Sequence, residues 1–195
     1  MFTSSVVVLS PGRTGSVLLA QNLSRCLGYP GQVAYIRDQD LTQAGSDAVL
    51  HSHQLFDRSQ LVGLTPVYSV RKNLIEALLS NYLASINNLY HSPISEPAPT
   101  VSAIEFNTSW METIIEIQQQ WFEFYCQQLT ESSLVVIYEA MIDHLYPPTV
   151  QYRAIYPNKR ELIQDYDQAV DWLHRRIPQS MLRAHNRFID FEIRP

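Results

Sequence analysis

The chain has 195 residues, of which 46% are hydrophobic and 17% are charged, and its formal net charge is −5. A chain of this length can bury one sizeable core, so we expect one domain over residues 1–195. The acidic balance argues against a nucleic-acid partner, because proteins that coat nucleic acid usually present a basic face. Any site that binds an anion must therefore rest on a few basic residues and not on a broadly basic surface.

Neither a membrane span nor a signal peptide is evident in the sequence. No window approaches the run of about 18 apolar residues that a membrane helix needs, and the N-terminus has no basic region followed by an apolar stretch. We expect a soluble, cytoplasmic protein without membrane insertion. Cys26 and Cys126 fall in predicted helices and have the spacing of neither a metal site nor a disulfide framework, so we expect two buried thiols.

The first predicted unit is a buried strand that leads through a small polar loop into a helix. An apolar run from residue 5 breaks at Pro11-Gly12, and a leucine stripe predicts a helix over 15–27 that ends at Gly28. The loop between them would direct backbone N–H groups and the positive end of the helix dipole at one point, where a phosphate or sulfate group fits. Two residues separate its glycines and no Lys follows the second, so the loop lacks the ATP-binding pattern G-x-x-x-x-G-K-[ST].

Three short strand candidates follow, over residues 32–36, 48–51 and 66–70. The third ends at the basic pair Arg71-Lys72. Asn73 comes next, and its side chain is suited to accept backbone N–H groups at the start of a helix over 74–86.

The second half of the chain begins with a proline-rich segment over 87–107, for which a lid and a plain connector are both open interpretations. A long helix over 108–129 would be capped by its first or second residue. Its apolar stripe, which we expect in the core, consists of Trp110, Ile114, Ile117, Trp121, Phe124 and Tyr125. A strand over 134–138 and a long helix over 160–175 complete the pattern.

Strands that alternate with helices predict an α/β fold. We expect a three-layer, P-loop-like sandwich in which a central, mostly parallel sheet of about four to five strands is flanked by helices. In such sheets ligands bind outside the carboxyl ends of the strands. Arg13, His51, His53, Arg71 and Lys72 all follow predicted strands, so we expect them at one edge of the sheet.

Three segments at these strand ends carry a family resemblance: Pro11-Gly12-Arg13-Thr14-Gly15-Ser16, Leu50-His51-Ser52-His53, and Ser69-Val70-Arg71-Lys72-Asn73 with Leu78-Leu79-Ser80. The chain resembles the P-loop-like sulfotransferases, which use 3′-phosphoadenosine 5′-phosphosulfate (PAPS). The resemblance covers roughly residues 5–85 and is weaker over 134–172. It implies a PAPS-dependent sulfotransferase.

The resemblance also implies which residues bind PAPS. The first loop would hold the 5′-phosphosulfate through Arg13, Thr14, Gly15, Ser16 and Val17. Many family members have Lys at the position of Arg13 and a hydroxyl residue at that of Val17, so Val17 would contribute only its backbone N–H.

The 3′-phosphate would be held by Ser80 together with either Arg71 or Lys72, between which the sequence does not decide. A late basic loop contacts this phosphate in many members, and Lys159 with Arg160 is the candidate here.

For the catalytic base, the resemblance implies His53, since an imidazole near neutral pH suits proton transfer. His51 stands where the cytosolic members have Lys. Other branches of the family use Glu, so Glu139 remains the alternative base. The reaction would be in-line transfer of a sulfuryl group from PAPS to an acceptor hydroxyl or amine, with adenosine 3′,5′-bisphosphate as the product, Arg13 stabilising the developing charge and no metal required.

Two rival functions remain open at this point. One is an ATP-dependent small-molecule kinase, because the strand over 134–138 ends at an acidic residue as magnesium-binding strands do. The other is a relative that binds an anion or nucleotide without catalysis. A small molecule or glycan would be the acceptor, and its identity is not encoded in any recognisable pattern. The chain is shorter than many members, which leaves either an open acceptor site or a homodimer in which a second subunit completes it.

Overall fold

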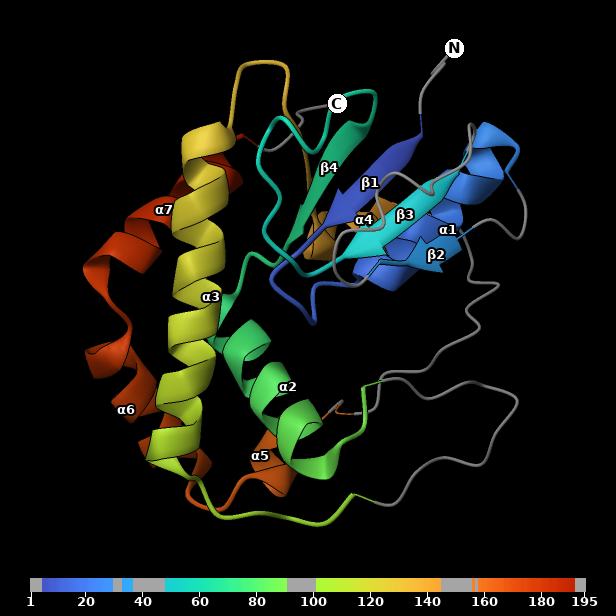
Figure 1. The fold of residues 1–195 in the computed structure, drawn as a ribbon. Helices are drawn as coiled ribbons and strands as arrows, with labels where there is room; N and C mark the ends of the chain where they lie inside the picture. Colours follow the sequence, from blue (N-terminus) through green and yellow to red (C-terminus); the bar gives the residue numbers. More distant parts are fainter. Residues whose placement is uncertain are drawn as a thin grey trace.

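The computed structural model describes residues 5–29, 33–36, 48–90, 101–144, 156 and 158–191. Within them lies one sheet of five parallel strands in the order β2-β3-β1-β4-β5 (Figure 1). The strands are β1 (Val6–Leu9), β2 (Val33–Tyr35), β3 (Val49–Ser52), β4 (Thr65–Val70) and β5 (Leu134–Ile137). The expected α/β class with a central parallel sheet is confirmed.

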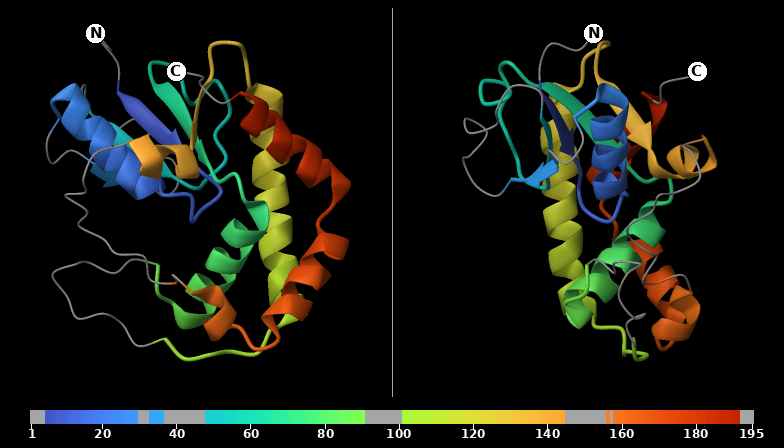
Figure 2. Two further views of the ribbon diagram at one scale, coloured as in Figure 1. Left: turned by 180° about the vertical axis from the view of Figure 1, so that it is seen from behind. Right: turned by 90° about the vertical axis from the view of Figure 1, so that its right-hand side faces the viewer.

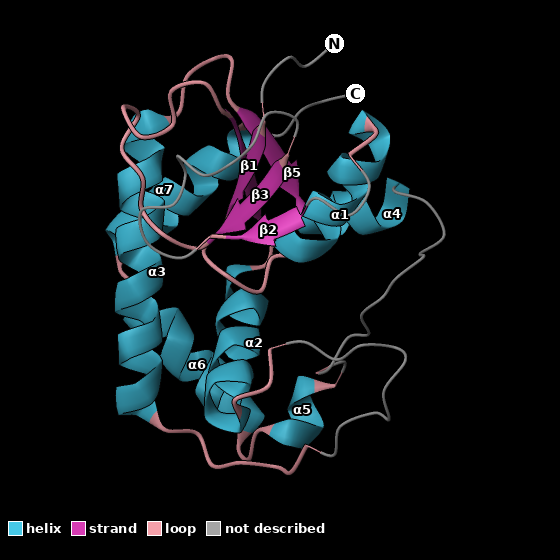
Figure 3. Ribbon diagram, turned by 45° about the vertical axis from the view of Figure 1, so that its right-hand side comes forward, coloured by secondary structure: helices cyan, strands magenta, loops and turns pink. Residues whose placement is uncertain are grey.

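Helices cover both faces of this sheet, as a three-layer sandwich requires. α1 and α4 lie on one face, and α3 and α7 lie on the other (Figures 2 and 3). The helices are α1 (Ser16–Leu27), α2 (Leu74–Asn87), α3 (Thr108–Gln128), α4 (Tyr138–His144), α5 (Lys159–Leu162), α6 (Tyr166–Arg176) and α7 (Gln179–Asp190). None of the helices in the described part of the chain is long and apolar enough to cross a membrane.

The two faces of the sheet belong to two apolar clusters, because successive residues of a strand point in opposite directions. In β1, Val6 and Val8 pack in the cluster that includes Leu19 of α1, whereas Val7 and Leu9 belong to the larger cluster under α3 and α7. All four residues of β1 are buried, as the central strand of a doubly covered sheet should be. β1 is therefore a rigid base for the loop that follows it.

The carboxyl ends of the strands form the edge from which α2 extends (Figure 1). Asn73 caps α2 by accepting the backbone N–H of Glu76 through its side chain, as predicted. The strand order places β1 between β3 and β4. Chain segments that leave β1, β3 and β4 therefore meet at the point where parallel α/β sheets bind ligands.

The long helix α3 differs from its prediction in two respects. Its cap is Asn107, one residue earlier than expected, whose side chain accepts the backbone N–H of Trp110. Trp110 and Ile117 were expected in the core but are 47% and 60% exposed. Trp110 donates its indole N–H to Ser85 Oγ of α2 at 2.7 Å but stays half exposed. Only part of the apolar stripe, including the buried Trp121, therefore belongs to the core.

The predicted single helix over 160–175 is wrong. The chain instead forms the short α5, breaks, and continues as α6 after Asp165, whose φ of 54° is left-handed. The break coincides with an isolated parallel bridge between Ile104 and Ile163, in which Gln164 donates its backbone N–H to the Ile104 carbonyl. α7 was not predicted. Residues 91–100 of the predicted lid or connector lie outside the described residues.

The two cysteines are also more accessible than expected. Cys26 is exposed near the end of α1, and Cys126 in α3 is half-buried. The expectation of two buried thiols is therefore wrong for both.

A candidate anion site at the carboxyl edge of the sheet

The loop between β1 and α1 has a backbone that ordinary residues rarely adopt. Gly12, Arg13 and Gly15 have φ values of 92°, 54° and 70°. Gly15 stands directly before α1, and a Cβ added there would lie 2.4 Å from Cδ2 of Tyr138. Only glycine combines this left-handed conformation with so close a neighbour. The loop therefore brings its backbone and the N-terminus of α1 together under the Tyr138 ring.

Two Ser–His pairs fasten the two ends of this loop to the end of β3. At the start of the loop, Ser10 Oγ lies 2.9 Å from Nδ1 of His53. At the start of α1, Ser16 Oγ lies 2.7 Å from Nε2 of His51. The imidazole rings themselves meet edge to face at 4.7 Å. The sequence placed both histidines after this strand, but His51 lies within β3 and only His53 follows it. Both contact the loop directly.

β4 and α2 hold the middle of the same loop. The hydroxyl of Thr14 donates to Ser69 Oγ at 3.2 Å, and that of Ser69 donates to the Thr14 carbonyl at 2.9 Å. Asn81 of α2 donates to the Pro11 carbonyl at 3.4 Å. The loop conformation is thereby fixed from three sides. The Thr14 hydroxyl is engaged with β4.

Arg13 extends from the loop toward the C-terminal end of α2. Its Nη1 donates to the Tyr90 carbonyl, and its guanidinium lies 5.7 Å from the centre of the Tyr156 ring. Its Nε is buried and has no hydrogen-bond partner among the described residues. Burial lowers the pKa of Arg13, and the nearby charge of Arg71 acts in the same direction. An anion between these two arginines would relieve both effects.

Arg71 and Ser80 are in contact, as the predicted phosphate pair requires. Arg71 Nη1 donates to Ser80 Oγ at 3.3 Å. Lys72 has an exposed side chain and directs its backbone N–H to Glu139 Oε2 at 2.8 Å. Of the two basic residues that the sequence left open, the structure therefore brings Arg71 to Ser80.

Tyr138 links the loop to Arg71, a role that the sequence analysis did not predict. Its ring packs against Gly15 on one side, and the Arg71 guanidinium lies 4.9 Å from its centre. Tyr138 begins α4 immediately after β5, whereas the sequence placed it at the end of that strand. The sequence did place Tyr138 at the end of a predicted strand, at the sheet edge where the predicted basic residues also lie, and this could have marked it as a site residue.

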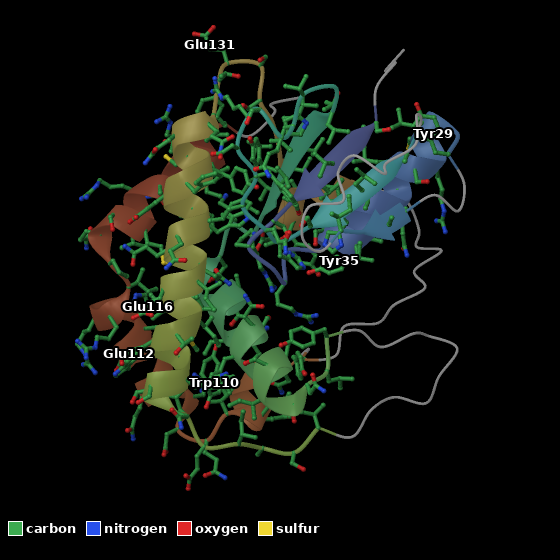
Figure 4. All side chains as sticks on the ribbon, viewed as in Figure 1. Tyr29, Tyr35, Trp110, Glu112, Glu116 and Glu131 are labelled. Carbon is green, nitrogen blue, oxygen red and sulfur yellow. The ribbon has the colours of Figure 1, made fainter. Side chains whose placement is uncertain are left out.

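His53 is held in a defined orientation. Its Nδ1 lies 3.0 Å from the Ser10 carbonyl, which can only accept a hydrogen bond. The same Nδ1 lies 2.9 Å from Ser10 Oγ, which can donate or accept. In the tautomer whose Nδ1 donates to the carbonyl, the basic lone pair is on Nε2. Tyr35, at the end of β2 (Figure 4), stacks at a tilt 5.7 Å from the ring of His53 and is 48% exposed.

The remaining predicted residues lie around this centre. Val17 is half-buried in the first turn of α1. Lys159 is buried and forms an ion pair of 2.6 Å with Glu76 in the first turn of α2, the helix that carries Ser80. Arg160 is exposed and pairs with Asp167 of α6. Both basic residues of the predicted late loop thus have carboxylate partners in this structure, and their role toward a cofactor stays a prediction.

The geometry supplies two basic positions, the loop with Arg13 and the Arg71–Ser80 pair. The Tyr138 ring contacts Gly15 of the loop and Arg71, and His53 lies at the start of the loop. Comparison of the sequence with protein-family models and with curated proteins finds no match.

Proposed function

We propose that this protein is a sulfotransferase that moves a sulfuryl group from PAPS to an acceptor hydroxyl or amine. One observation carries the proposal: Tyr138 contacts both basic positions, the backbone of the loop at Gly15 and the guanidinium of Arg71. PAPS has the matching chemistry, because it carries anionic groups on both the 5′ and the 3′ side of one nucleoside.

The loop is suited to the 5′-phosphosulfate. Backbone N–H groups at the start of α1 and the helix dipole favour an anion there, and Arg13 adds a charge whose Nε has no partner among the described residues. The hydrogen-bond contacts of the loop with Ser69, His51 and His53 hold this backbone in place before a ligand binds. Preorganised donors cost little reorganisation during the reaction.

The second position is suited to the 3′-phosphate. Arg71 offers guanidinium N–H donors and Ser80 a hydroxyl, and Arg favours this kind of contact with phosphate oxygens. ATP has no phosphate on the 3′ side and would leave this pair without an anion. The pair therefore favours the sulfotransferase over the kinase.

The chemistry assigns one role to each group. The acceptor oxygen attacks sulfur, the bond from sulfur to the bridging oxygen breaks, and adenosine 3′,5′-bisphosphate leaves with that oxygen. The acceptor proton passes to Nε2 of His53, since Nδ1 faces the Ser10 carbonyl. Arg13 and the loop N–H groups stabilise the charge that develops on the leaving phosphate.

Calorimetric titration tests the proposal. We expect adenosine 3′,5′-bisphosphate to bind the wild-type protein more tightly than AMP or ATP with magnesium. Arg13→Ala and Ser80→Ala should each weaken that binding, and only Ser80→Ala should reduce the preference over AMP. A matched control is Arg176→Ala, which removes an exposed arginine paired with Glu112 on the outer helices.

Absence of any preference for the 3′-phosphate in the wild-type protein would refute the PAPS site. Tight binding of the bisphosphate without turnover across a broad screen of hydroxyl and amine acceptors would instead identify a non-catalytic nucleotide-binding relative.

A further inference from the structure

Glu139 is the most heavily engaged carboxylate at this edge of the sheet. Its Oε2 accepts the backbone N–H of Lys72 at 2.8 Å, and its Oε1 accepts the backbone N–H of Asn73 at 3.4 Å. Oε1 also lies 3.3 Å from Nε of Arg71. One carboxylate from α4 thus joins three consecutive residues at the turn between β4 and α2.

These contacts fix the Arg71 side chain from one end. Nε faces Glu139, Nη1 faces Ser80, and the Tyr138 ring lies beneath the guanidinium. A planar guanidinium held at Nε and along one face can present its remaining N–H groups in only a narrow range of directions.

The Arg71 backbone is fixed as well, from a distant part of the chain. His185 of α7 is buried, and its Nε2 lies 2.8 Å from the Arg71 carbonyl, so this nitrogen must carry the donated proton. The His185 ring is itself held edge to face against Phe122 of α3 at 5.2 Å. Backbone and side chain of Arg71 are therefore positioned by separate helices.

We propose that Glu139 is a positioning residue that orients Arg71 toward the 3′-phosphate, and that it is not the general base. This inference rests on the proposed function, because it concerns the same phosphate. A carboxylate that already accepts two backbone N–H groups and a guanidinium is poorly placed to take an acceptor proton. It is well placed to give Arg71 one orientation, which is what discrimination between a 3′-phosphate and a 3′-hydroxyl needs.

The test compares Glu139→Gln with the wild-type protein and with Glu112→Gln, a control that neutralises an exposed carboxylate paired with Arg176. Adenosine 3′,5′-bisphosphate and AMP are the calorimetric probes. We expect Glu139→Gln to bind the bisphosphate about tenfold more weakly, as loss of one charge-assisted contact implies, with AMP binding unchanged. Turnover at saturating PAPS should change little, and Glu112→Gln should match the wild-type protein in every measurement.

Three results would overturn the positioning role. A fall in turnover of about a hundredfold or more with unchanged bisphosphate affinity would make Glu139 the base. Equal weakening of both nucleotides, together with a lower unfolding midpoint, would give it a purely structural role. Tighter bisphosphate binding would show that the carboxylate competes with the phosphate for Arg71. A wild-type protein that does not prefer the bisphosphate over AMP would instead remove the proposed function itself, so the two failures are distinguishable.

Discussion

Substitution of Gly15 by alanine tests the geometry of the loop. The new Cβ would lie 2.4 Å from Cδ2 and 2.6 Å from Cε2 of Tyr138. Carbon atoms pack at about 3.5 to 4.0 Å, so the ring would have to move by more than about 1 Å. A left-handed conformation costs an alanine about 1 to 2 kcal/mol, and overpacking a well-filled site adds about 1 to 3 kcal/mol. We expect the free energy of unfolding to fall by about 2 to 5 kcal/mol in total.

Gly63 provides the matched control, because its φ is 82° and a Cβ added there meets no atom within 4 Å. Gly63→Ala should therefore cost only the backbone part, about 1 to 2 kcal/mol. Urea denaturation of both variants and of the wild-type protein measures the difference. Equal losses in the two variants would refute the argument that the Tyr138 ring closes over Gly15. In the Gly15→Ala/Tyr138→Ala double variant, the excess cost at position 15 should shrink to what the 3.0 Å contact with Met141 Cε contributes.

Two further predictions concern titrating groups at the site. His53→Ala should reduce turnover by about 10²- to 10⁴-fold while calorimetry shows nearly unchanged affinity for adenosine 3′,5′-bisphosphate; undiminished turnover would remove His53 from the mechanism. Burial raises the pKa of Glu76, but the hydrogen bonds and charges of Lys159, Tyr166 and Arg71 outweigh this and bring it below its usual 4.5. The carboxylate therefore stabilises the fold at neutral pH and loses that contribution as the pH falls below about 4.5, through the lowered pKa of the folded state. Denaturation at several pH values measures the difference in free energy of unfolding between the wild-type protein and Glu76→Gln. This difference should be largest near pH 7 and become small at acidic pH. A difference that stays constant with pH would contradict the ion pair.

The parts of the fold that sequence predicts well are those determined by local pattern. β1 and β4 are short apolar runs between polar breaks, and Asn73 has the side chain that a helix cap needs. Other parts of the fold depend on contacts between residues that are far apart in the sequence. The predicted helix over 160–175 breaks because Ile163 pairs with Ile104, a partner that no local window contains.

In the candidate site, too, local contacts were easier to predict from the sequence than distant ones. Ser80 and its basic partner share one strand-to-helix unit, and the resemblance implied the pair but left Arg71 and Lys72 open; the structure brings Arg71 to Ser80. Tyr138 and His185 reach Arg71 only through the tertiary arrangement of α4 and α7, and neither follows from its own neighbourhood. Because His185 has no metal-like spacing with other histidines, no role was predicted for it from the sequence.

The contact between His185 and Arg71 also has a consequence for when the site becomes functional. A ribosome makes Arg71 first and His185 114 residues later. Until α7 has emerged and packed on α3, the Arg71 carbonyl lacks the donor that fixes it. Domains fold as units during synthesis, and contacts of this sequence separation close late. A growing chain would thus already contain every residue of the loop and of the Arg71–Ser80 pair, yet would acquire the arrangement proposed to bind nucleotide only with the last of its helices described here.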